Sequence, residues 1–345
     1  GLGGFHLAVD ASNDEAVNLL RRRKLREEKP LAIMVRDLDV AKSICYLSDK
    51  EIEILTSPQK PIVLLKKKDN CWIAESVAPR NRFLGVMLPY TPLHHLLFGD
   101  QLQALVMTSG NISEEPIAID IQEAIKRLKG IADYFLDHNR QILSRCDDSV
   151  VRVVEGEVVQ IRRSRGWVPL PIEFEGCDQS ILCCGAHLKN TIALTRRNEV
   201  ILSQHIGDLE NMAAYEFYRS AIKHLERILE VEPTAVAYDS HPDYLSTRFA
   251  QDLPLRNKIP VQHHHAHIAT CLGEAGVEGP VLGVALDGTG YGEDGTIWGG
   301  EILVVKRDGF ERLGHLETVR MPGGEKAIRE PWRMAIAWAS KLDHD

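Results

Sequence analysis

The clearest structural signal in the sequence is Val281-Leu282-Gly283-Val284-Ala285-Leu286-Asp287-Gly288-Thr289-Gly290-Tyr291-Gly292. A short apolar run that ends in a carboxylate and glycines predicts a buried strand, followed by a turn whose backbone can approach a phosphate closely. Residues 297–305 predict the returning strand of a hairpin. Strands predicted at 181–184, 191–195 and 200–203 repeat this order earlier in the chain. The repetition predicts a two-lobed fold in which each lobe begins with a phosphate-facing hairpin.

A histidine cluster precedes this strand in the run Val261-Gln262-His263-His264-His265-Ala266-His267. On a helix, His263 and His267 lie one turn apart on the same face, where two imidazole nitrogens can reach one divalent ion. Apolar residues on both sides of the run argue against a tag and against a flexible loop. From residue types alone, a metal site and a structural or solvated cluster are both open.

Length and composition limit the class of protein. The chain has 345 residues, of which 44% are hydrophobic, so two domains with real cores are expected. Its longest apolar stretches fall short of a membrane span, which predicts a cytoplasmic protein with no membrane partner. The seven cysteines are scattered and form no Cys-x-x-Cys pair, as is typical of a reducing compartment. A net charge of −8 makes nucleic acid an unlikely partner.

The first half alternates strands with helices. Strands are predicted at 5–9, 31–35, 61–65, 105–111 and 150–154, and helices from Ser12-Asn13 to about 24, at 40–47 and at 121–128. Residues 171–176 are predicted to be a linker. In the second half, helices are predicted over the apolar face from 214 to 229, from 246, after Pro260 and at 331–338, with a strand at 235–238. The fold class predicted is α/β and α+β.

Two groups of residues could bind phosphate. Lys24, Arg26 and Lys29 supply positive charge, and a polar strand end supplies hydroxyl, amide and backbone N–H groups through Thr108, Ser109, Asn111 and Ser113. A second basic set could complete this cradle: Arg145 with Asp147 and Asp148, then Arg162, Arg163 and Arg165. The alternative to phosphate binding is that neither group has a function. Taken alone, an arginine-rich helix face is usually just solvated, and Thr-Ser-Gly-Asn is an ordinary turn.

The turn after residue 286 indicates a ligand-binding site more clearly than these two groups do. Asp287 can hold a metal or a metal-bound water, Thr289 can donate to an oxygen, and the glycines Gly288, Gly290 and Gly292 let the backbone approach a phosphate. The alternative is a plain hairpin turn, which needs far less glycine.

Several long motifs occur together in one order along the chain. They are Gly1-Leu2-Gly3-Gly4-Phe5-His6-Leu7, Lys29-Pro30-Leu31-Ala32-Ile33-Met34, Thr108-Ser109-Gly110-Asn111, Arg145-Cys146-Asp147-Asp148-Ser149-Val150, Arg162-Arg163-Ser164-Arg165-Gly166, Ser203-Gln204-His205-Ile206-Gly207-Asp208, Asp239-Ser240-His241-Pro242-Asp243-Tyr244, the histidine cluster and the Asp287 turn. In these motifs the chain resembles the hydrogenase maturation carbamoyltransferase family, HypF. The resemblance implies a YrdC-like domain with a twisted open sheet at 1–172. It also implies a two-lobed Kae1-like domain of the ASKHA fold at 178–345, with its second lobe incomplete.

The resemblance also implies an activity and its ligands. The YrdC-like domain would form carbamoyl adenylate from ATP, with Mg²⁺, and carbamate derived from carbamoyl phosphate. The Kae1-like domain would transfer the carbamoyl group to the C-terminal cysteine of HypE, as a precursor of the cyanide ligands of [NiFe] hydrogenase. Zn²⁺ or Fe²⁺ would be the metal of the second site.

Residue roles follow from the same resemblance. The implied catalytic residues are Lys24, Arg26, Arg145 and Asp287. The implied nucleotide-binding residues are Lys29, Thr108, Ser109, Asn111, Ser113, Arg163, Gly288, Thr289, Gly290 and Gly292. His263 and His267 would bind the metal, and the family's third protein ligand, a late aspartate, would lie beyond residue 345.

Two other functions fit part of the pattern. Enzymes of tRNA threonylcarbamoylation use the same two domain types, although the fusion in one chain, the histidine run and the acidic charge speak against them. A noncatalytic metal-binding module built on the histidine cluster is the other alternative. It predicts tight metal binding without ATP–pyrophosphate exchange.

Overall fold

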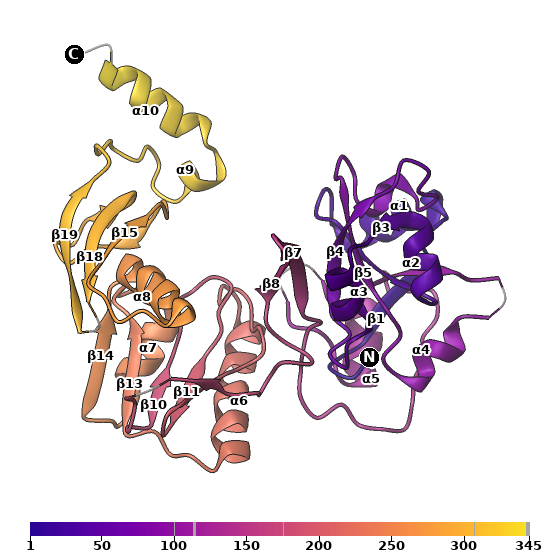
Figure 1. The fold of residues 1–345 in the computed structure, drawn as a ribbon, viewed down its shortest axis with the longest axis horizontal. Coiled ribbons are helices and arrows are strands. Elements are labelled where there is room, and N and C mark those ends of the chain that lie inside the picture. The colour runs from indigo at the N-terminus through magenta and orange to yellow at the C-terminus, as the bar shows by residue number, and fades with distance from the viewer. Residues whose placement is uncertain (100, 113–114, 175, 307, 343–345) are drawn as a thin grey trace. The chain divides into compact units, whose positions relative to one another are not determined.

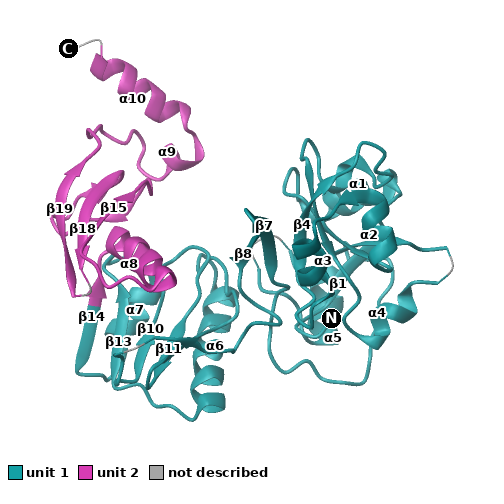
Figure 2. Cartoon of the chain, viewed as in Figure 1, with its two compact units in different colours: residues 1–259 teal, residues 260–345 magenta. Residues whose placement is uncertain are grey.

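The computed structural model describes residues 1–99, 101–112, 115–174, 176–306 and 308–342. The chain forms two units, Gly1–Ile259 and Pro260–Asp345 (Figures 1 and 2). No helix among the described residues is both long and apolar enough to cross a membrane.

A mixed eight-stranded sheet forms the centre of the first part of the Gly1–Ile259 unit. Its strand order is β1-β6-β2-β5-β4-β7-β8, and β3 pairs with β4. The pairs β2–β5 and β4–β7 are parallel, while the other pairs are antiparallel. The strands are β1 His6–Asp10, β2 Ala32–Val35, β3 Cys45–Tyr46, β4 Ile62–Lys67, β5 Phe83–Met87, β6 Ala104–Ser109, β7 Val150–Val154 and β8 Glu157–Arg162.

Helices around this sheet begin at polar caps. The Asn13 side chain accepts from the Ala16 N–H at the start of α1, and Ser48 and Glu51 form a capping box at the start of α3. Leu25 adopts a left-handed conformation, φ 54°, which ends α1 directly after Lys24. The helices are α1 Asp14–Lys24, α2 Leu38–Ile44, α3 Asp49–Thr56, the 3-10 turn η1 Glu75–Val77, α4 Pro92–Leu97 and α5 Ile121–Leu128.

A six-stranded sheet follows in the order β14-β13-β10-β11-β12-β9. The antiparallel meander β10-β11-β12 confirms the prediction for residues 181–203. The α6 face from Ala214 to Leu225 is buried in the core of this part, as its apolar spacing predicts. The elements are β9 Ile172–Glu173, β10 Ile181–Cys183, β11 Ala193–Arg196, β12 Glu199–Leu202, α6 Met212–Leu229, β13 Ala235–Asp239, α7 Leu245–Asp252 and β14 Asn257–Val261.

The Pro260–Asp345 unit packs α8 against a three-stranded sheet of order β15-β18-β19. Ile268 of α8 meets Ala285, Leu303 and Val305 of the sheet in a small apolar core. A two-stranded ribbon, β16 with β17, lies between β15 and β18 in the sequence. The elements are α8 His263–Ala275, β15 Val281–Ala285, β16 Gly290–Tyr291, β17 Ile297–Trp298, β18 Glu301–Lys306, β19 Gly309–His315, α9 Lys326–Arg329 and α10 Trp332–Leu342.

Three local predictions were wrong. Residues 297–305 are not one strand, because Gly300 has a φ of +73° and separates β17 from β18. The predicted linker contains β9, whose Ile172 pairs with Val200, while Glu175 lies outside the described residues. The helix predicted at 40–47 ends at Ile44, and its last residues form β3 instead. Elements β5, β8, β14, β19, α3, α4 and α9 were not predicted.

Candidate functional site

The cations predicted to bind phosphate gather at the end of β6. The Lys24 Nζ donates to the backbone oxygens of Ser109 and Asn111, and it lies 2.7 Å from Asn111 Oδ1. Arg26 donates from Nη1 to the Thr108 hydroxyl at 3.2 Å and from Nε to the Lys29 carbonyl at 3.1 Å. Because α1 ends at Lys24, the chain turns there and brings both cations to the same strand end.

Burial and mutual repulsion weaken the basicity of these cations. Burial, with the positive charge of Arg26, lowers the pKa of Lys24 to about 7. Burial likewise lowers the pKa of Arg26 to about 10, and that of Lys29 is lowered by burial and by Arg26. Cations that depress one another's pKa are stabilised when an anion approaches. This group is therefore suited to bind the phosphates of a nucleotide.

Asn111 organises the polar side of the group. Its Oδ1 accepts from Lys24 and from the Ser109 hydroxyl at 2.7 Å, and its Nδ2 donates to the Glu115 carbonyl at 2.6 Å. These partners fix which way the amide faces. Ser113, predicted to join this group, lies outside the described residues.

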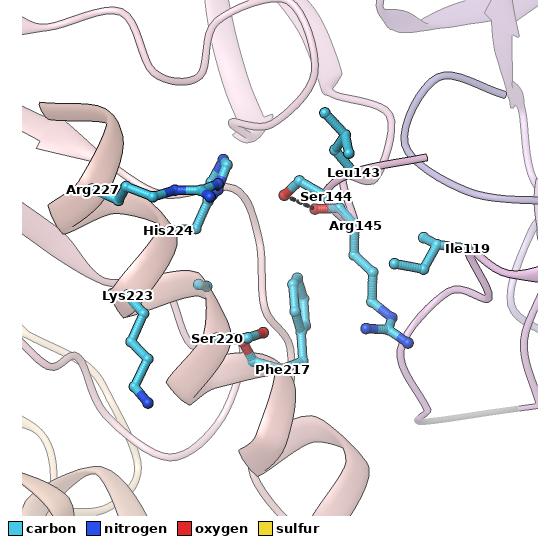
Figure 3. A pocket seen from close by; sticks show the side chains of 10 residues that line it. Ile119, Leu143, Ser144, Arg145, Phe217, Ser220, Lys223, His224 and Arg227 are labelled. Carbon is cyan, nitrogen blue, oxygen red and sulfur yellow. Dashed lines mark hydrogen bonds between the residues drawn. The ribbon is translucent and has the colours of Figure 1, made fainter. Parts of the chain in front are cut away.

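Arg145 is held by a different set of contacts. Its Nε donates to the Ile117 carbonyl at 2.9 Å, its Nη2 lies 3.0 Å from Glu123, and its guanidinium is 5.8 Å from the centre of the Phe217 ring. It borders a hollow of about 430 Å³. Figure 3 shows His224, Arg227 and Phe217 of α6 on one side of this hollow and Leu143 and Arg145 on the other.

Arg163 also has other partners, since it donates to the Leu170 carbonyl at 3.0 Å and to Gln160 at 3.3 Å. The neighbouring Arg162 is the arginine whose charge helps to lower the pKa of both Arg26 and Lys29. Arg162 is the last residue of β8, and Arg163 follows it. Arg162 was among the arginines that the sequence suggested could complete the cradle, although β8 itself was not predicted.

The second unit brings together three potential metal ligands. One ligand atom each from His263, His267 and Asp287 lies within 4.8 Å of the other two. His263 begins α8, and its ring centre is 4.8 Å from that of His267, one turn later. His263 Nε2 and Asp287 Oδ2 are 3.3 Å apart, but they are not aligned for a hydrogen bond, so this buried Oδ2 has no such partner among the described residues. Two imidazoles and a carboxylate form a ligand set that suits Zn²⁺ or Fe²⁺.

The structure distinguishes the glycines of the Asp287 turn. A Cβ added to Gly290 would lie 2.5 Å from His264 Cε1, and one added to Gly292 would lie 2.0 Å from Trp298 Nε1. Packing therefore requires these two glycines. A Cβ on Gly288 would meet nothing within 4 Å, and Thr289 is half-buried. The contact of Gly288, Thr289, Gly290 and Gly292 with a nucleotide stays a prediction.

Comparison with known proteins identifies the family. Residues 1–164 match the model described as telomere recombination (Sua5, YciO, YrdC), 176–274 match the HypF Kae1-like domain, and 283–344 match the second subdomain of the carbamoyltransferase Kae1-like domain. Carbamoyltransferase HypF2 of Cupriavidus necator is 49% identical over 98% of this chain and 44% of its own length. The chain belongs to the HypF family. The HypF of Rhizobium leguminosarum bv. viciae is 46% identical over 98% of this chain and 45% of its own length.

Solved HypF structures share the fold. A full-length HypF crystal structure in a phosphate- and nucleotide-bound form matches 98% of this chain and 53% of that chain, with a TM-score of 0.93 and 48% identity. HypF of T. kodakarensis matches 95% of this chain and 43% of its own, with a TM-score of 0.89 and 44% identity. The predicted YrdC-like and Kae1-like fold is confirmed. The chain spans about half the length of the curated HypF relatives it matches.

Proposed function

We propose that this chain forms carbamoyl adenylate from ATP and carbamate and transfers the carbamoyl group to a protein thiol. Its relatives are named carbamoyltransferases, and its two candidate sites suit the two half-reactions. The carbamate would come from carbamoyl phosphate. The acceptor would be the C-terminal cysteine of HypE, and the product a precursor of the cyanide ligands of [NiFe] hydrogenase. Residues 1–172 would perform the first step and residues 178–345 the second.

The observation that carries this proposal is the group of cations around the buried Lys24. In the first step a carbamate oxygen attacks the α-phosphorus of ATP, and the bond to pyrophosphate breaks. Lys24, Arg26 and Lys29 would neutralise the phosphate charge that shifts toward the leaving group. Thr108, Ser109 and Asn111 would align the nucleotide, because their polar atoms are fixed at the strand end. ATP would arrive with Mg²⁺.

In the second step, the thiolate sulfur attacks the carbamoyl carbon and AMP leaves. His263, His267 and Asp287 would hold a divalent metal, Zn²⁺ or Fe²⁺. When bound, such an ion acts as a Lewis acid that polarises the carbamoyl oxygen. The backbone at Gly288 and Thr289 would lie against the adenylate, since no side chain fills the space at Gly288.

Carbamate-dependent exchange of labelled pyrophosphate into ATP tests the first step. We expect exchange when ammonium carbamate is supplied, and a loss of roughly 10²–10³-fold in Lys24→Met, as is typical when one donor to a developing charge is removed. Lys50→Met is the matched control, because Lys50 lies on the surface of α3 and pairs with Glu53. Exchange that requires threonine instead of carbamate would favour the threonylcarbamoylation alternative. No exchange with either substrate would contradict the proposal.

A further inference from the structure

His264 is fully buried between the two histidines proposed as metal ligands. Neither step of the proposed reaction uses it. Its ring lies edge-on to that of His263, with ring centres 6.0 Å apart, and it occupies the space that a side chain at Gly290 would need. A buried imidazole with two polar nitrogens needs defined partners.

Gln262 determines which nitrogen of His264 carries the proton. The Gln262 Oε1 accepts from the His265 backbone N–H at 2.9 Å, and this bond caps α8. The amide Nε2 therefore faces the other way, 3.2 Å from the Tyr291 carbonyl and 3.1 Å from His264 Nδ1. Because an amide nitrogen only donates, Nδ1 must accept. A neutral His264 ring then carries its proton on Nε2.

That Nε2 faces Asp287. It lies 3.9 Å from Asp287 Oδ2. The backbone carbonyl of Asp287 is a second acceptor close to the ring. Both Nε2 and Oδ2 are buried and have no hydrogen-bond partner among the described residues. A distance of 3.9 Å exceeds an ordinary N–H···O bond by about 1 Å, a gap that a rotation of the carboxylate can close. A buried donor and a buried acceptor thus lie near each other, with the Asp287 carbonyl also close to the donor.

We propose that His264 is a positioning residue that holds the Asp287 carboxylate beside His263 and His267 through its Nε2 proton. Gln262 sets the tautomer, and Gly290 leaves room for the ring. Carboxylates that bind metals are commonly fixed in this way by a hydrogen bond from outside the ligand set. The inference rests on the proposed metal site, and it assigns to His264 a task distinct from ligation.

Titration of the metal-free chain with Co²⁺, followed by calorimetry and by the visible absorption of the bound ion, tests the proposal. His264→Gln places an amide N–H near the position of Nε2, whereas His264→Asn reaches only the position of Nδ1. We expect the Gln variant to bind Co²⁺ about as tightly as the parent and the Asn variant to lose about 10–100-fold in affinity. His265→Asn is the control, because the His265 ring packs against Phe310, with ring centres 5.1 Å apart.

The outcomes separate this inference from the function on which it rests. If the parent chain binds no Co²⁺, the proposed metal site fails. If the parent binds Co²⁺ and the two His264 variants bind it equally well or equally poorly, the metal site stands and the role of His264 is overturned. Both variants bury the same amide group, so any loss of folding stability is shared, and thermal melts of each variant check this.

Discussion

Nucleotide binding should be coupled to protonation of Lys24. The pKa of this buried lysine is lowered to about 7, so about nine-tenths of the free protein should carry a neutral Lys24 at pH 8. Phosphates beside Nζ favour the ammonium and raise its pKa toward the ordinary value. Binding at pH 8 should therefore take up about 0.9 proton, and binding at pH 6 about 0.1. Nucleotide affinity should fall by up to about tenfold per pH unit above pH 7.

Calorimetry measures this uptake directly. ATP is titrated into the chain at pH 8 in buffers of different ionisation enthalpy, and the slope of the observed enthalpy against the buffer enthalpy gives the number of protons. The phosphates of free ATP are ionised at this pH and contribute little. Lys24→Met should remove the slope. The change of slope in Lys29→Met gives the part of the proton uptake that belongs to Lys29, whose pKa is also lowered.

Two results would refute this reasoning. A slope near zero in the parent chain would mean that the oxygens around Nζ, from Ser109 and Asn111, keep Lys24 charged before the nucleotide binds. Equal slopes in the parent and in Lys24→Met would place the titrating group elsewhere. A slope near zero would also mean that the affinity does not decline above pH 7.

Three further predictions concern stability and metal binding. Gly290→Ala should destabilise the fold by roughly 1–3 kcal/mol in urea unfolding, because its Cβ would meet a buried imidazole at 2.5 Å, while Gly288→Ala should have little effect; equal losses would contradict the packing argument. Asp287→Asn should weaken Zn²⁺ binding at least tenfold by calorimetry, and unchanged affinity would remove this carboxylate from the ligand set. Asp148→Asn should cost about 3–5 kcal/mol by breaking a buried ion pair with Arg165. Contacts with His6 and Arg165 hold the Asp148 pKa well below its usual value. The stability that this carboxylate contributes should therefore be present above about pH 4 and decline as the pH falls through the lowered pKa. A parent chain whose stability is flat below pH 4 would argue against this ion pair.

The elements that carry most of the candidate site could be predicted because each depends on local geometry. His263 and His267 share a face through the helical repeat alone, and Asp287 follows a strand marked by its apolar run. Lys24 stands at the end of a helix that its cap and periodicity define. In each case the informative residues lie within one or two turns of each other or directly after one strand.

The surroundings of the remaining predicted cations depend on contacts that the sequence alone does not reveal. Arg162 pairs with Val150 across the β7–β8 hairpin, beyond a register shift next to Val151 that the sequence does not mark. Glu123 and the carbonyl of Ile117 hold Arg145 next to α6, and its role on the carbamoyl or phosphate side stays a prediction. The contacts of Arg145 join residues more than twenty positions apart, and no local pattern encodes them.

The sequence by itself determined the two-part α/β architecture, the family and the helix that carries the histidines, since these follow from periodicity, caps and long motifs. Only the tertiary structure decided which histidine of that run is buried. The packing of α8 on the β15-β18-β19 sheet turns His264 inward, toward Gln262 and Asp287, because a helix in contact with a sheet must bury one stripe of its surface. The four imidazoles of this run, which look alike in the sequence, thus differ in burial and in partners.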